Sequence, residues 1–129
     1  MEDLLLKPDI HGKTPLIDFK TSGELRIEGR SIVENVIDYY RPALEWIRGL
    51  VDTSPSTVTV NVKLEYFNTG SSKMLLSAFK LLEGVHHSGS TRVCVNWYYG
   101  EEDRDMYEAG YDYQSIVKIP FKIILVIEN

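Results

Sequence analysis

The chain has 129 residues, of which 43% are hydrophobic and 26% charged, values typical of one globular domain. Its formal net charge of -5 gives no general attraction for phosphate backbones or anionic lipid, which disfavours nucleic acid and membrane surfaces as partners. One cysteine, Cys94, excludes an internal disulfide and argues against a small secreted scaffold. The apolar run at residues 4–6 is too short for a signal peptide, so we expect a cytoplasmic protein.

Turn-forming residues dominate the beginning of the chain. Residues 1–13 include Pro8 and Gly12, and we expect them to lie loosely on the surface, ahead of a single domain over residues 14–129. A hairpin is predicted next, with strands over residues 16–20 and 24–28.

A helix is predicted to follow the hairpin. Ser31 and Glu34 have the spacing of a capping box, in which the serine hydroxyl and the glutamate carboxylate accept from free backbone N–H groups. Pro42 removes one hydrogen bond and its ring presses on the carbonyl of Asp38, so we expect a kink or a split there. The apolar face consists of Val33, Val36, Ile37, Tyr40, Leu44 and Ile47.

Strict alternation over residues 57–66 predicts the clearest strand of the chain, with one buried face and one wet face. The face predicted to be buried consists of Val58, Val60, Val62, Leu64 and Tyr66. A turn at residues 68–71 leads into an amphipathic helix. Its inner positions are Met74, Leu75, Ala78, Phe79, Leu82 and Val85.

The last third of the chain predicts a strand, a helix and a strand. Residues 91–99 form a strand that buries alternate side chains, and residues 101–114 form an acidic helix weakened by Gly110. The apolar run over residues 121–127 predicts a strand buried on both faces. Alternating strands and helices indicate an α/β fold with parallel strand pairs. Polar positions on the two middle strands indicate a mixed β-sheet with helices mainly on one face.

The segment from Tyr66 to Lys73 joins the best strand to the second helix, and ligands and modifications usually act at such turns. Its hydroxyls lie next to the unpaired N–H groups of the helix start, where a phosphate is favoured. Residue pattern alone does not choose among Thr69, Ser71 and Ser72, and it favours the simpler interpretation that Ser71 or Ser72 is a plain helix cap. The glycine spacing of a phosphate-binding loop is absent.

Other candidate sites are weaker. His86 and His87 are adjacent, so their rings diverge on a helix, and no further ligand completes a metal shell with Cys94. The acidic run from Glu101 to Asp112 fails as a calcium loop, because Glu108 stands where glycine is required. This run is either a solvated helix face or a recognition surface for a basic partner. No nucleophile motif is present, so we predict neither an enzyme nor a bound cofactor.

The chain resembles the SiaC family of bacterial regulatory phosphoproteins, whose fold is similar to the STAS domains of anti-sigma-factor antagonists. The resemblance covers nearly the whole chain from Thr14 onward. Its most specific part is the motif Leu64-x-Tyr66-Phe67-Asn68-Thr69 followed by Ser71, Ser72 and Lys73. Supporting residues, in order along the chain, are Gly29-Arg30-Ser31, Glu34-Asn35, Tyr40, Pro42, Trp46, Trp97-Tyr98, Asp103, Asp105 and Pro120-Phe121.

This resemblance implies a phosphorylation switch. The threonine that a dedicated kinase modifies and a PP2C-type phosphatase restores corresponds to Thr69, and the unphosphorylated form is expected to bind and activate a diguanylate cyclase in cyclic-di-GMP signalling and biofilm control. Gly70 stands where the family often has serine. The expected partner surface consists of Arg30, Asn68, Thr69, Gly70, Ser71, Ser72 and Lys73.

Two alternatives remain open. A small-molecule or anion-binding domain would use the helix N-terminus at Ser71 and Ser72. A partner switch of the anti-sigma-factor-antagonist type would act on a different target.

Overall fold

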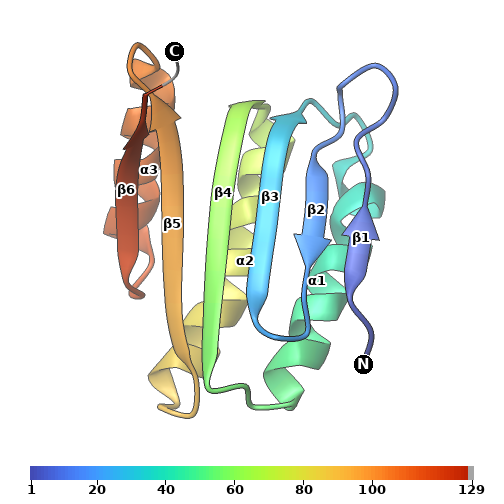
Figure 1. Cartoon of the computed structure of the whole chain (residues 1–129), viewed down its shortest axis with the longest axis vertical. Helices are drawn as coiled ribbons and strands as arrows, with labels where there is room; N and C mark the ends of the chain where they lie inside the picture. Colours follow the sequence, from blue (N-terminus) through green and yellow to red (C-terminus); the bar gives the residue numbers. More distant parts are fainter. Residues whose placement is uncertain (128–129) are drawn as a thin grey trace.

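The computed structural model describes residues 1–127 and shows a six-stranded sheet with three helices (Figure 1). The strands are β1 (Leu4–Leu6), β2 (Leu16–Phe19), β3 (Glu24–Ser31), β4 (Thr57–Phe67), β5 (Arg92–Gly100) and β6 (Phe121–Val126). The helices are α1 (Val36–Asp52), α2 (Thr69–His87) and α3 (Arg104–Ile116).

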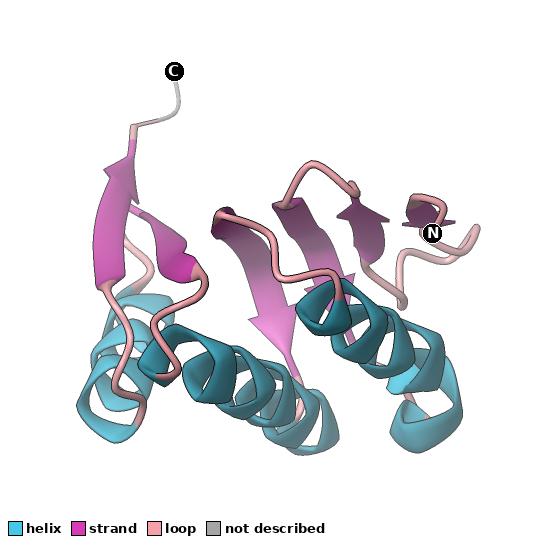
Figure 2. Cartoon of the chain, turned by 90° about the horizontal axis from the view of Figure 1, so that it is seen from below, coloured by secondary structure: helices cyan, strands magenta, loops and turns pink. Residues whose placement is uncertain are grey.

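The strands lie in the sheet in the same order as in the chain. The pairs β1–β2 and β2–β3 are antiparallel, whereas β3, β4, β5 and β6 run parallel and are joined through the three helices. All three helices cover the same face of the sheet (Figure 2). The predicted α/β fold, with a mixed sheet and helices on one face, is confirmed.

The core lies between the sheet and the helices, where period-two strands meet period-3.6 helices. In β4, Val58, Val60, Val62 and Leu64 are buried as predicted. Tyr66 is instead 53% exposed, beyond a register shift between Gly29 and Arg30 of β3. The largest fully buried side chain is Trp97, whose indole N–H donates to the Met106 carbonyl at 2.9 Å.

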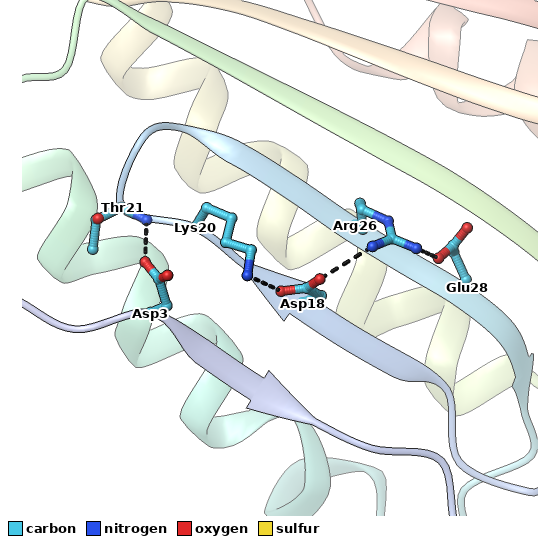
Figure 3. Close-up of polar contacts among 6 residues, drawn as sticks. All are labelled: Asp3, Asp18, Lys20, Thr21, Arg26 and Glu28. Atoms are coloured by element: carbon cyan, nitrogen blue, oxygen red, sulfur yellow. Dashed lines mark hydrogen bonds and ion pairs between the residues drawn. The ribbon is translucent and has the colours of Figure 1, made fainter.

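The opposite face of the sheet carries no helix and is polar, as the alternation predicted (Figure 2). Asp18 lies between Lys20 and Arg26, at 3.3 and 3.1 Å, and Arg26 also binds Glu28 (Figure 3). We call this surface the open face. Its charged pairs are partly solvated, so they stabilise the fold only modestly.

The N-terminus differs from the prediction of a loose segment, because Leu4–Leu6 forms the edge strand β1. The Asp3 carboxylate accepts from the Thr21 backbone N–H at 2.7 Å, as Figure 3 shows. The Trp46 indole donates to the Glu2 carbonyl at 2.7 Å. Three apolar residues are too few to show a strand period, so the sequence pattern gave no signal for β1.

The predicted capping box at Ser31 and Glu34 is wrong. Strand β3 continues to Ser31, which is fully buried, and α1 begins at Val36 with Asn35 as its N-cap. The shift between Gly29 and Arg30 prolongs the pairing with β4 and carries Ser31 into the core. Pro42 lies inside α1, which the structure shows as one unsplit helix.

Strand β6 is not buried on both faces, as its apolar run had predicted. It pairs only with β5 among the described strands, and Leu125 is 45% exposed. Its alternate residues Phe121 and Ile123 pack against the core. An edge position on a sheet with one uncovered face explains why a continuous apolar run remains half-solvated.

Candidate functional site

Residues 66–73, the segment singled out by the sequence, lie at the carboxyl ends of the parallel strands, where all three helices begin (Figure 1). Each helix has a polar N-cap whose side chain accepts from the N–H three residues on. In α2 this cap is Asn68, which accepts from Ser71 at 2.9 Å. Neither Ser71 nor Ser72 caps the helix. The expectation that one of these serines is the cap was therefore wrong, and Asn68 has that role.

Asn68 also fixes the turn to the strand and loop beside it. Its side-chain amide donates to the Val33 carbonyl at 3.0 Å, and its backbone N–H donates to the Ser31 carbonyl at 2.9 Å. The preceding Phe67 packs edge-on against Trp97, with ring centroids 5.9 Å apart. The start of α2 is therefore held in place before its first helical turn.

Ser71 is fully buried and belongs to a network of three hydroxyls. The Ser31 hydroxyl donates to the Ser71 oxygen at 2.7 Å, and the Ser71 hydroxyl donates to the Ser31 carbonyl at 3.1 Å. The Tyr40 oxygen lies 2.6 Å from the Ser31 hydroxyl. Burial raises the pKa of Tyr40 to about 12, so this phenol is neutral at physiological pH.

Ser72 forms a second link, from α2 to α3. Its hydroxyl lies 2.8 Å from the Tyr113 oxygen, and the Tyr113 hydroxyl donates to the Ser72 carbonyl at 2.9 Å. Burial raises the pKa of Tyr113 above its ordinary value. Both serines after Thr69 are therefore engaged, one to α1 and β3 and the other to α3.

Thr69 is exposed, and its hydroxyl makes no hydrogen bond within residues 1–127. It is the first residue of α2, next to the N–H groups of the first turn, which have no carbonyl partner within the helix. A Cβ on Gly70 would lie 3.1 Å from Cγ1 of Val36. The first turn of α2 thus packs closely on Val36, the first residue of α1.

Two positive side chains belong to the predicted surface. Lys73 is exposed one helical turn beyond Thr69, on the same side of α2. Arg30 is exposed and pairs in register with Tyr66, at the carboxyl end of β4. Neither makes an ion pair within the described part of the chain.

Sequence reasoning missed Tyr40 and Tyr113 as supports of this turn, and it gave Ser31 the wrong role. The apolar spacing placed Tyr40 on the inner face of α1, but nothing in the pattern showed which hydroxyl its phenol would meet. Tyr113 fell within an acidic stretch, and its burial arises only when α3 packs on β5 and β6.

The alternative metal ligands do not come together. His86 Nδ1 accepts from the Val93 N–H at 3.1 Å, and His87 Nε2 lies 3.0 Å from the Lys118 carbonyl. Within residues 1–127, no group of three His, Cys, Asp or Glu side chains is placed to hold a metal ion. Over the same residues, no helix has the length and hydropathy needed to cross a bilayer.

Similar proteins show the same fold. A SiaC structure from Pseudomonas aeruginosa has a TM-score of 0.87 and 24% identity over 98% of this chain and 100% of that one. Apo-SiaC from the same organism has a TM-score of 0.86 and 26% identity over 95% and 98%. SiaC solved in complex with the diguanylate cyclase SiaD, which it activates, has a TM-score of 0.89 and 24% identity over 96% and 100%.

The family is shown by sequence. An uncharacterized protein of Pseudomonas aeruginosa strain UCBPP-PA14 is 24% identical over 102 residues, which are 79% of this chain and 80% of that protein. The one-sided α/β sheet is the fold that this chain shares with the SiaC structures. The model of the SiaC family of regulatory phosphoproteins matches residues 9–126, and the chain belongs to this family.

Proposed function

We propose that this protein is a partner switch in which Thr69 is phosphorylated by a dedicated kinase and restored by a PP2C-type phosphatase. The unphosphorylated form binds and activates a diguanylate cyclase in the cytoplasm, and the turn from Asn68 to Lys73 is the contact surface. Family membership and the SiaC structure with its cyclase support this proposal. The protein itself needs no catalytic role.

The observation that carries the choice of residue is the contrast in exposure along one helical turn. Ser71 is fully buried, and Ser72 is half-buried against Tyr113. Thr69 alone of the three is exposed with an unengaged hydroxyl among the described residues. A kinase must take the acceptor oxygen into its own active site. Because the Thr69 hydroxyl is already exposed, its phosphorylation does not require α2 to unfold.

Phosphate at Thr69 would be compatible with the folded protein. The helix N–H groups and the positive end of the helix dipole favour an anion there, by roughly 0.3–1 kcal/mol at an exposed site. Lys73 on the same side of the helix would offset part of the charge. A partner packed on this surface would instead have to bury a group carrying about -1.5 to -2 charges. Phosphorylation would therefore release the partner without melting the helix.

The site assignment is tested by isolating the protein from the cells that express it and mapping its phosphorylation by mass spectrometry. The wild-type chain is compared with Thr69→Val, which keeps the side-chain shape, and with Ser72→Ala as the matched control. We expect the phosphoryl group on wild type and Ser72→Ala and its absence from Thr69→Val. A phosphoryl group that persists in Thr69→Val would overturn the assignment.

The output is tested by adding purified, unphosphorylated protein to the diguanylate cyclases of the same cells and measuring the rate of cyclic-di-GMP synthesis from GTP. One cyclase should be accelerated by the unphosphorylated protein and not by the Thr69-phosphorylated form. If no cyclase responds, the cyclase role is wrong, whereas the phosphorylation site would still stand on its own experiment.

The anion-binding alternative has weaker support. The Ser71 N–H is already taken by Asn68, and the Ser71 hydroxyl is sealed in the core. An anion at this helix start would therefore meet neither group. A thermal-shift screen against nucleotides and phosphorylated metabolites tests this alternative, because saturating ligand at 100 times its dissociation constant adds about 2.7 kcal/mol of stability.

A further inference from the structure

A groove lies on the open face of the sheet. This is the face that no helix covers (Figure 2). Its larger part has a volume of about 720 Å³ and lies at the carboxyl ends of β4, β5 and β6, beside the end of β3. A smaller hollow of about 290 Å³ adjoins it and shares four lining residues, Glu28, Lys63, Tyr98 and Val126. We call the two together the open-face groove.

Two glycines help to keep the larger part open. Gly29 and Gly100 both line it, and a Cβ built on either one would meet no atom within 4 Å. Gly100 follows Tyr98 by two residues in β5, so both positions face the same side of the sheet. The space above Gly100 is therefore open, and a larger side chain at this position would fill it.

The larger part of the groove is strongly acidic, with five carboxylates against the single ammonium of Lys63. The carboxylates belong to Glu28, Glu65, Glu101, Glu102 and Asp103. Glu28 binds Arg26, and Asp103 caps α3 by accepting from Met106. Glu65, Glu101 and Glu102 make no ion pair within residues 1–127.

This arrangement divides the acidic run that the sequence presented as one segment. Glu101, Glu102 and Asp103 precede α3 and line the groove, whereas Asp105, Glu108 and Asp112 belong to the helix itself. Glu108 is paired with Arg104 at 3.1 Å on the helix surface. Only the first part of the run therefore has the concave setting that a binding surface needs.

Tyr98 lines both parts of the groove, beside the carboxylates. A guanidinium group can stack on a tyrosine ring and bind a carboxylate through two parallel N–H donors at the same time. A lysine ammonium, as a compact charge, gains less from such a site. The combination of acids and an aromatic side chain therefore fits arginine better than lysine.

We propose that the open-face groove binds an extended, arginine-bearing segment of a protein partner. An arginine side chain would lie at Glu65, Glu101 and Glu102 in the larger part. The smaller hollow, which Arg26 and Lys63 line together with Glu28, would hold an uncharged part of the segment. A groove that runs along the sheet surface suits an extended chain, and the excess of carboxylates in the larger part favours a basic side chain there. This surface is separate from the proposed Thr69 switch and does not depend on it.

The test uses the full chain and a capped hexapeptide that alternates alanine and arginine. Binding is followed by NMR titration at low salt, with backbone amides as reporters. We expect shifts concentrated at Tyr98, Gly100 and Glu101. Replacing the arginines by citrulline, which has nearly the same shape without the charge, should weaken binding by about tenfold or more.

Two variants distinguish peptide binding in the groove from binding through the overall negative charge of the chain. Glu101→Gln with Glu102→Gln removes two groove charges, and Gly100→Leu fills the space without a change of charge. Glu45→Gln with Asp52→Asn removes two exposed charges from α1 and is the matched control. Both groove variants should weaken peptide binding about tenfold, and the control less than twofold.

Equal weakening by the control pair and the groove pair would overturn the proposal, because the peptide would then be bound by net charge alone. Unchanged affinity in Gly100→Leu would overturn it too, because the peptide would not be occupying the groove. Thermal unfolding of each variant verifies the fold before titration. Peptide binding that passes these tests would stand even if Thr69 proved to be unphosphorylated.

Discussion

Helices α2 and α3 begin in the same way but present different surfaces. Each follows a parallel strand and is capped by a side chain that accepts from the N–H three residues on. The start of α2 has no acid in its first turn, and its two serines are turned inward. The start of α3 is surrounded by carboxylates. A phosphate added at α2 would change a surface with little charge into an anionic one, whereas at α3 it would add to an existing negative charge.

The largest expected effect comes from putting charge inside the α2 start. Ser71→Asp would bury a carboxylate beside the hydroxyls of Ser31 and Tyr40 and should lower the free energy of unfolding by about 4 kcal/mol. The exposed control Ser77→Asp on the same helix should lower it by less than about 1 kcal/mol. Urea unfolding measures both. Similar losses in the two variants would contradict a buried Ser71.

The second effect concerns pH and the phenol that supports Ser31. Because the folded protein raises the pKa of Tyr40 from 10.0 to about 12, it holds this proton more tightly than the unfolded chain does. The contribution to stability is complete below pH 10 and is lost as the pH rises towards 12, by about 3 kcal/mol. Urea unfolding between pH 8 and pH 12 should show this decline, reduced in Tyr40→Phe. An identical decline in the variant would assign it to other groups.

The third effect compares the two helix caps directly. Asn68→Ala removes one bond to Ser71 and one to the Val33 carbonyl, and should cost about 2 kcal/mol. Asp103→Ala removes only the bond to Met106 and should cost about 1 kcal/mol. Chemical denaturation of the two variants at pH 7 gives the difference. If Asp103→Ala were the more damaging, the α2 start would not be the more firmly anchored of the two.

The smallest effect is expected at Thr69 itself. Thr69→Glu places a carboxylate on the first turn of α2 and should raise the free energy of unfolding by about 0.5 kcal/mol, less at high salt. Lys73→Ala combined with Thr69→Glu tests whether the lysine contributes to this gain. A loss of more than 1 kcal/mol in Thr69→Glu would show that this helix start does not tolerate an anion, and would count against the proposed mechanism of the switch.

Much of the fold could be predicted because several elements carry a clear period. The alternation from Val58 to Leu64 predicted a half-buried strand, and the spacing from Leu75 to Val85 predicted a helix that packs on the sheet. The predictions that failed were those that assigned a hydrogen-bond partner to a polar side chain when several partners were equally plausible. Ser31 matched a capping box, yet tertiary pairing extended β3 and placed that hydroxyl in the core.

The sequence indicated the candidate segment, residues 66–73, but not how its side chains are arranged. The hydroxyls of Thr69, Ser71 and Ser72 are chemically alike. Only packing against α1 and α3 distinguishes the buried Ser71 from the exposed Thr69. The cap at Asn68 was missed because serine has the same preference for that position as asparagine. The open-face groove depends on residues from four strands, and no local pattern in the sequence indicates such a surface.

The strand order has a consequence for how the chain is made. Because β1 to β6 lie side by side in the order in which they are synthesised, each strand leaving the ribosome meets an edge that is already formed. Within residues 1–127, no strand has to be inserted between two earlier ones. The nascent chain can therefore assemble by growth at one edge, and the groove, which needs β3 to β6, is completed only after β6 has been added.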